Sequence, residues 1–107
     1  KITALVPSGS ESGEKEDLGG LYIAPGFIDI HCHGGDGAEF IDGTVEAVKR
    51  ACAIHKKHGT RVIYPTLSAS DTATVVKALE AIEKAADESE IIIAGVHLEG
   101  PYLSAEM

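Results

Sequence analysis

Two histidines that stand one residue apart are the residues of this chain best suited to chemistry. They lie in the segment PGFIDIHCHGG (residues 25–35), at the end of an apolar stretch. Alternate residues of a β-strand point to the same face, so His31 and His33 can reach one metal ion while Cys32 faces away. The pair alone is a weak signal, because histidines at a strand end also hydrogen-bond to backbone groups.

A carboxylate further along the chain strengthens the metal interpretation. Glu99 follows a second apolar stretch, in the segment HLEGP (residues 97–101). The carboxyl ends of parallel strands meet at one edge of a sheet, and ligands collect there. The combination of His31, His33 and Glu99 therefore predicts a shared metal site and favours a metal-dependent hydrolase.

Three apolar stretches predict the strands that position these residues. Residues 27–33 form a near-continuous apolar strand, which is typical of a parallel sheet with both faces buried. Residues 61–67 predict a second strand, and residues 91–98 predict a third, whose polar end is His97 or Glu99. The usual strand spacing places the first and third strands roughly 10 Å apart.

Two amphipathic stretches predict helices between the strands. The first helix is expected over residues 45–58, with Thr44 as its N-terminal cap and Gly59 at its C-terminal end. The second is expected over about residues 71–88. Its buried positions follow spacings of four, three and four residues: Val75, Leu79, Ile82 and Ala86. The order strand, helix, strand, helix, strand predicts an α/β fold with a parallel sheet and right-handed crossovers.

Other residues with reactive side chains have simpler explanations. His55 and His58 lie near the end of the first helix, where solvent or the helix dipole accounts for them. Cys32 is expected to be a small core residue, and Asp29 a buried, hydrogen-bonded carboxylate that supports the strand or the ligands. Residues 34–37 (GGDG) lack a nucleotide-binding fingerprint and are expected to form a mobile loop over the site.

Composition excludes several classes of protein. The chain has 107 residues, of which 44% are hydrophobic, enough for the core of one small domain. Its net charge of -8 argues against a nucleic-acid or membrane surface as partner. The two cysteines suggest no disulfide framework, and no secretory signal is visible, so a cytoplasmic protein is expected. The chain begins without methionine and stops at Met107, and we interpret both ends as cuts.

Two of these segments resemble a known family. Residues 24–34 resemble the first barrel strand of the amidohydrolase superfamily, and residues 96–102 (VHLEGPY) resemble a segment more specific to the N-acetylglucosamine-6-phosphate deacetylase family. The strand TRVIYPTL (residues 60–67) also matches that family. The resemblance implies a (β/α)8 TIM-type barrel and a small β-sandwich domain built from both chain ends. Residues 1–23 would be part of the sandwich, and residues 24–107 the first three strands and two helices of the incomplete barrel.

The resemblance also implies a reaction and a metal. In the family, the enzyme hydrolyses the acetamide of N-acetylglucosamine 6-phosphate to glucosamine 6-phosphate and acetate, in amino-sugar catabolism. The glutamate of the HLEGP segment binds the catalytic metal, so Glu99 takes this role, and His31 and His33 would hold a second ion. Zinc or iron is expected, as one or two ions. The general acid/base aspartate and most phosphate-binding residues would lie beyond Met107, some on the second subunit of a homodimer.

Two alternatives remain at this stage. One is another amidohydrolase, of the dihydroorotase-like or amino-acid deacetylase type. The other is a non-catalytic α/β module whose histidines bind a structural or adventitious metal.

Overall fold

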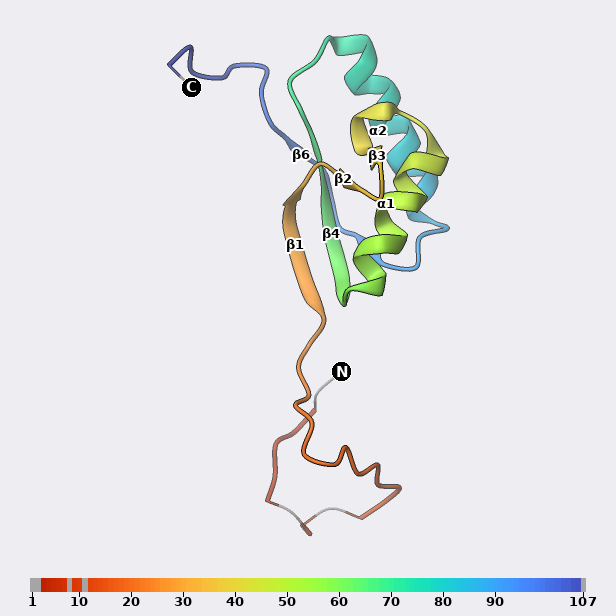
Figure 1. Ribbon diagram of the computed structural model, residues 1–107, viewed down its shortest axis with the longest axis vertical. Helices are drawn as coiled ribbons and strands as arrows, with labels where there is room; N and C mark the ends of the chain where they lie inside the picture. The colour runs from red at the N-terminus through yellow and green to blue at the C-terminus, as the bar shows by residue number, and fades with distance from the viewer. Residues whose placement is uncertain (1–2, 8, 11, 107) are drawn as a thin grey trace.

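Strand β4 (Thr60–Leu67) is the middle strand of a parallel sheet (Figure 1). Strand β1 (Phe27–Cys32) pairs with one edge of β4, and β5 (Ile92–Ile93) and β6 (His97–Leu98) pair with the other. The computed structural model describes residues 3–7, 9–10 and 12–106. The predicted parallel sheet, with the second long strand in the middle, is confirmed.

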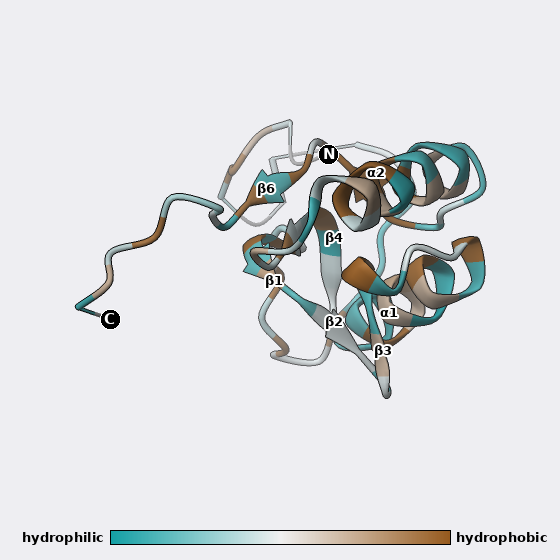
Figure 2. Ribbon diagram, turned by 90° about the horizontal axis from the view of Figure 1, so that it is seen from above, coloured by the Kyte–Doolittle hydropathy of each residue, from teal (hydrophilic) through white to brown (hydrophobic). Residues whose placement is uncertain are grey.

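Both predicted helices are present, and their caps explain where they begin. Helix α1 (Val45–Lys57) begins after Thr44, whose hydroxyl accepts a hydrogen bond from the backbone N–H of Ala47. Gly59 follows the helix with a φ of 97°, a left-handed conformation that glycine adopts without strain. Helix α2 (Thr72–Ala86) begins after Asp71, whose carboxylate accepts a hydrogen bond from the backbone N–H of Thr74. The two helices lie side by side along the sheet (Figure 2), and neither is long and apolar enough to cross a membrane.

The core lies between the helices and β4. Its largest fully buried hydrophobic side chains come from a short 3-10 helix, η1 (Phe40–Asp42), from α1 and from β4: Phe40, Val48, Ile63 and Leu67. Removing such side chains from water is the main stabilising contribution that these residues make.

The buried side of α2 differs in part from the predicted stripe. It consists of small residues and one isoleucine: Ala78, Ala81, Ile82 and Ala85. Of the predicted positions, Ile82 is fully in the core, while Val75 and Leu79 are only partly buried. At Ala78 the helix comes close to another stretch of backbone, since a Cβ atom built on Gly43 would lie 3.4 Å from the backbone nitrogen of Ala78.

The glycine-rich segment after β1 forms a hairpin, so the prediction of a loop there is wrong. Strands β2 (Gly34–Gly35) and β3 (Ala38–Glu39) pair antiparallel across Asp36 and Gly37. These two residues have φ values of 55° and 73°, as a two-residue type I′ turn requires. The Asp-Gly pair is the sequence signal for this turn.

The third predicted strand is interrupted. Within residues 91–98 only β5 and β6 have strand geometry, and Ala94 to Val96 separate them. The backbone N–H of Ala94 still donates to the Ile63 carbonyl at 3.1 Å, so the segment follows β4 throughout. Gly95 weakens a strand because it has no side chain to pack, and a Cβ atom there would lie 3.2 Å from the Tyr64 ring.

Two further expectations are not met by the described residues. Ile28 and Ile30 on β1 are 64% and 69% exposed, because only β4 pairs with this strand and the helices cover one face of the sheet. Residues 1–23 were also expected to form part of a β-sandwich domain. The described residues before Phe27 contain no strand, and Lys1 and Ile2 lie outside the described residues. The β-sandwich assignment therefore stays a prediction.

Truncation of Phe40 tests the position of the core. Phe40→Ala should lower the free energy of unfolding by about 3–5 kcal/mol, because it leaves a cavity in the packed interior. Denaturant unfolding measures this change. Tyr22→Ala, at a fully exposed side chain, is the matched control and should change stability by less than about 0.5 kcal/mol. Equal midpoints for the two variants would contradict this core.

The cap of α2 predicts a dependence of stability on pH. Hydrogen bonds from the Thr74 hydroxyl and backbone N–H lower the pKa of the Asp71 carboxyl from its ordinary value of 3.8. The charged cap therefore stabilises the fold above that value, and its contribution is lost as the pH falls through the lowered pKa. Asp71→Asn keeps a capping side chain that does not titrate. Between about pH 5 and pH 2, wild-type stability should fall relative to this variant, and a constant difference would refute the role of Asp71.

Candidate metal centre

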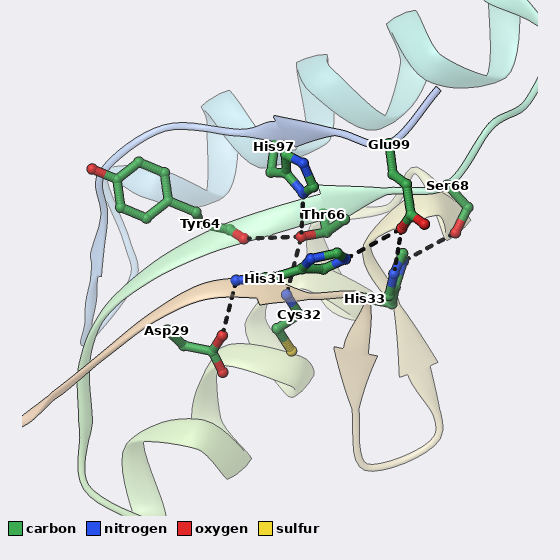
Figure 3. Close-up of polar contacts among 9 residues, drawn as sticks. All are labelled: Asp29, His31, Cys32, His33, Tyr64, Thr66, Ser68, His97 and Glu99. Atoms are coloured by element: carbon green, nitrogen blue, oxygen red, sulfur yellow. Dashed lines mark hydrogen bonds and ion pairs between the residues drawn. The ribbon is translucent and has the colours of Figure 1, made fainter. Parts of the chain in front are cut away.

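Three of the predicted site residues converge on one carboxylate oxygen (Figure 3). Glu99 Oε2 lies 3.2 Å from His31 Nε2 and 2.9 Å from His33 Nε2. The histidines come from the end of β1 and the glutamate follows β6, so residues about 66 positions apart meet above the end of β4. The set predicted from sequence is thus brought together by the fold.

Strand register explains the convergence. Cys32 pairs with Pro65, and His97 pairs with Thr66, so β1 and β6 end at the same level on opposite sides of β4. The backbone N–H of Glu99 then donates to the Leu67 carbonyl at 3.0 Å, which fixes the glutamate beyond the strand end.

Thr66 connects the three strands directly below the site. Its side chain is fully buried, and its Oγ1 accepts a hydrogen bond from the backbone N–H of Cys32 at 3.0 Å. The same hydroxyl lies 3.3 Å from His97 Nδ1. The His97 ring in turn meets the His31 ring edge-on, with centroids 4.6 Å apart. His97 therefore packs against a candidate ligand and holds its ring in place.

Ser68 and Asp29 support the histidine pair from two sides. Ser68 Oγ lies 3.0 Å from His33 Nδ1, so a proton on Nδ1 leaves the Nε2 lone pair free for a metal. Asp29 Oδ1 accepts a hydrogen bond from the backbone N–H of His31 at 3.1 Å. The prediction that Asp29 is a hydrogen-bonded carboxylate supporting the strand is confirmed, although its side chain is only partly buried.

The donor set fits a divalent transition metal. Two neutral imidazole nitrogens and one carboxylate oxygen are ligands that zinc and iron(II) accept. A tetrahedral zinc ion with ordinary bond lengths separates a nitrogen and an oxygen ligand by about 3.3 Å. The observed separations of 2.9 and 3.2 Å are close to that value. The side chains of His31, His33 and Glu99 are 51%, 42% and 37% exposed, which leaves one side of the group open to a substrate.

The surroundings of His55 differ most from what the sequence predicted. It was assigned to solvent or to the helix dipole, but its ring faces β1, where Nε2 lies 3.0 Å from Cys32 Sγ. Cys32 does face away from His31 and His33, as predicted (Figure 3). Sequence reasoning also assigned no role to Ser68. The spacing along the chain was a signal for both residues. His55 lies three residues after the buried Cys52 of the helix, and Ser68 lies two residues after Thr66 of the strand, so each shares a face with its neighbour.

Comparison with known proteins places the chain in a family. The model of the amidohydrolase family matches residues 22–107. The chain belongs to this family. Amidohydrolases are generally metal-dependent, and the group of His31, His33 and Glu99 in this amidohydrolase has the donor atoms for an ion.

Individual relatives show which members of the family the chain resembles. The mouse (Mus musculus) N-acetylglucosamine-6-phosphate deacetylase is 35% identical over 97 residues, 87% of this chain and 24% of the relative. The N-acetylgalactosamine-6-phosphate deacetylase of Shewanella sp. (strain ANA-3) is 34% identical over 83 residues, 77% of this chain and 21% of the relative. The chain spans about a quarter of the length of the curated relatives that it matches.

A solved structure gives the same result. It is a mutant N-acetyl-D-glucosamine-6-phosphate deacetylase from Mycobacterium smegmatis in complex with N-acetyl-D-glucosamine-6-phosphate. The TM-score is 0.67 at 34% identity, and the match covers 75% of this chain and 20% of that chain.

Ser68→Ala tests how the histidine pair is held. The change removes the partner of His33 Nδ1, and loss of such a supporting hydrogen bond typically weakens metal binding about 10- to 100-fold. Zinc affinity, measured by competition with a chelator, should fall by this amount, and Ser68→Thr should restore most of it. Ser70→Ala, on the same exposed loop, is the control. Unchanged affinity in Ser68→Ala would show that His33 needs no such support.

Proposed function

We propose that this chain is part of a metal-dependent deacetylase. The enzyme would hydrolyse the acetamide of N-acetylglucosamine 6-phosphate to glucosamine 6-phosphate and acetate, in amino-sugar catabolism. The observation that carries the proposal is the contact of Glu99 with His31 and His33 at an open sheet edge. The names of the mouse relative and of the M. smegmatis structure support the choice of substrate.

In this proposal Glu99 is the principal metal ligand, and His31 and His33 are further ligands to one or two zinc or iron ions. When bound, such an ion supplies Lewis acidity, which polarises an amide carbonyl and lowers the pKa of water, so that hydroxide is available to attack at neutral pH. The Glu99 carboxylate offsets the charge of the cation. Ser68 and His97 keep the two imidazole rings aimed at the same point, which preserves the geometry that the reaction needs.

The remaining parts of the active site are proposed to lie outside residues 1–107. They are an aspartate that serves as general acid/base for the leaving amine, and most of the phosphate-binding groups, some from the second subunit of a cytoplasmic homodimer. The fold proposed for the whole enzyme is a (β/α)8 barrel, of which residues 24–107 form the start, with residues 1–23 in a small β-sandwich domain. The exposed isoleucines of β1 lie on the faces of the strand, and the remaining elements of such a barrel would cover them.

The galactosamine epimer is a second candidate substrate. The Shewanella relative is a deacetylase of N-acetylgalactosamine 6-phosphate at nearly the same identity as the mouse relative. The two sugars differ in the hydroxyl at carbon 4 and share the acetamide. His31, His33 and Glu99 are proposed to act at the acetamide, so they suit either sugar.

Acetate release by the complete enzyme that contains this chain, with zinc or iron(II) added, tests the proposal. Both sugar phosphates should be compared, and the glucosamine form should give the higher kcat/KM. Glu99→Gln should lower kcat/KM by more than about 100-fold and reduce bound metal, because it removes the charged ligand. Glu106→Gln, at an exposed residue, is the control for loss of a nearby carboxylate.

Three outcomes would overturn the proposal. Acetate release that Glu99→Gln leaves unchanged would remove the glutamate from the mechanism. Metal binding without hydrolysis of either sugar phosphate would favour the non-catalytic module. Hydrolysis of a cyclic or amino-acid amide in place of the sugar amide would favour another amidohydrolase.

A further inference from the structure

A second group of side chains that could hold a metal ion lies on the opposite face of β1, where a shift in strand register between Asp29 and Cys32 brings these two residues to the same side. Asp29 and Cys32 come from this strand and His55 comes from α1, and one donor atom of each lies within 4.8 Å of the others. In Figure 3, Cys32 points away from His31 and His33, so the group is separate from the candidate metal centre. The proposed deacetylase reaction uses none of these three side chains as a ligand.

The donor atoms form a small triangle. Cys32 Sγ lies 3.0 Å from His55 Nε2 and 3.2 Å from the carbonyl oxygen of Gly34, and His55 Nε2 lies 3.0 Å from the same carbonyl. Tetrahedral zinc with ordinary bond lengths separates its sulfur and nitrogen ligands by about 3.5 Å. An outward movement of about half an ångström therefore gives three ligands on one side of an ion.

Asp29 stands where a supporting carboxylate is expected. Its Oδ2 lies 3.9 Å from His55 Nδ1, on the far side of the ring from Cys32. A histidine that binds zinc through one nitrogen usually donates its other N–H to a carboxylate or carbonyl, which fixes the ring orientation. The order of atoms from Asp29 through His55 to Cys32 matches this pattern, although the Asp29–His55 distance of 3.9 Å must shorten for the hydrogen bond to form.

A catalytic thiol explains the group less well. The order Cys32, His55, Asp29 also resembles a nucleophile with its base and orienting carboxylate. Burial raises the pKa of the Cys32 thiol, a hydrogen bond with the Gly34 backbone lowers it, and the nearby Asp29 charge raises it. Activated thiols have lowered pKa values and a substrate pocket beside them. Cys32 Sγ instead faces the His55 ring and the Gly34 carbonyl.

An ion can reach the group. The side chains of His55 and Asp29 are 23% and 31% exposed, which is enough for a cation to enter from solvent. A thiolate together with an imidazole selects zinc over magnesium or calcium, which prefer oxygen ligands. The strongly acidic chain, with a net charge of -8, favours the approach of a cation.

We propose that Cys32, His55 and the Gly34 carbonyl oxygen bind a zinc-type ion, with Asp29 orienting His55. Binding would release the thiol proton to solvent and form a bond between the metal and the sulfur. The three ligands come from β1, α1 and β2, so the ion would join the strand, the helix and the hairpin. Its role would be structural and independent of the deacetylase proposal.

Cobalt(II) titration tests this site, because a cobalt–thiolate bond gives a charge-transfer absorption band in the near ultraviolet. The protein should first carry His31→Asn, His33→Asn and Glu99→Gln, so that the candidate metal centre cannot contribute. This triple variant should still bind one equivalent of cobalt with the thiolate band. Adding Cys32→Ser or His55→Ala should abolish the band. Adding Cys52→Ser should leave it, because Cys52 is a buried cysteine outside the group.

The result that overturns the proposal is equally specific. Circular dichroism identifies the variants that fold, and Cys32→Ala replaces Cys32→Ser if the serine variant does not. A folded triple variant without a thiolate band, or a band that survives the loss of Cys32, would rule the site out. Failure of acetate release would leave this result unaffected, because the titration contains no sugar substrate and no residue of the first centre.

Discussion

The alignment of β1 and β6 on either side of β4 is the constraint on which the rest of the structure depends. Parallel strands can share a site only if they end at the same level, and here the pairs Cys32–Pro65 and Thr66–His97 set that level. The buried hydroxyl of Thr66 contributes to both alignments, through the Cys32 backbone and the His97 ring. A hydrogen bond to a buried hydroxyl is costly to lose, so a slip of either strand is disfavoured.

The arrangement of side chains at the candidate metal centre follows from this alignment of strands. One carboxylate oxygen of Glu99 lies close to the imidazole rings of His31 and His33. Ser68 contacts the His33 ring, and His97 packs against the His31 ring, so both rings are held in position. Side chains held in this way lose little freedom when they gather around a cation. The strand ends and the residues next to them therefore position the side chains of the centre. The helices contribute indirectly, because they pack against the sheet in the core.

Much of this arrangement could be predicted from the sequence, because its signals are local. Thr44, Gly59 and Asp71 mark helix ends by their own conformational preferences, and the alternation along β1 assigns His31 and His33 to one face. The family resemblance supplied the significance of Glu99. The hairpin at Asp36–Gly37 had a local signal as well, but it was interpreted only as a glycine-rich loop.

What could not be predicted depends on tertiary contacts. The small residues Ala78, Ala81 and Ala85 of α2 face the core, and the close approach of Gly43 to Ala78 is a contact that no periodicity reveals. The His55 ring meets Cys32 because α1 packs against β1 and the hairpin, so the chemistry of that histidine depends on a neighbour 23 positions away. Ile28 and Ile30 are apolar in sequence, yet their exposure depends on which elements cover the strand.

The Asp29 carboxylate links the two faces of β1. One of its oxygens accepts the backbone N–H of His31, and the other faces the ring of His55. A single side chain thus serves two groups of donor atoms on opposite sides of one strand. A substitution at position 29 would therefore disturb both sides of the strand at once: it would remove the acceptor of the His31 backbone N–H and the carboxylate beside the His55 ring.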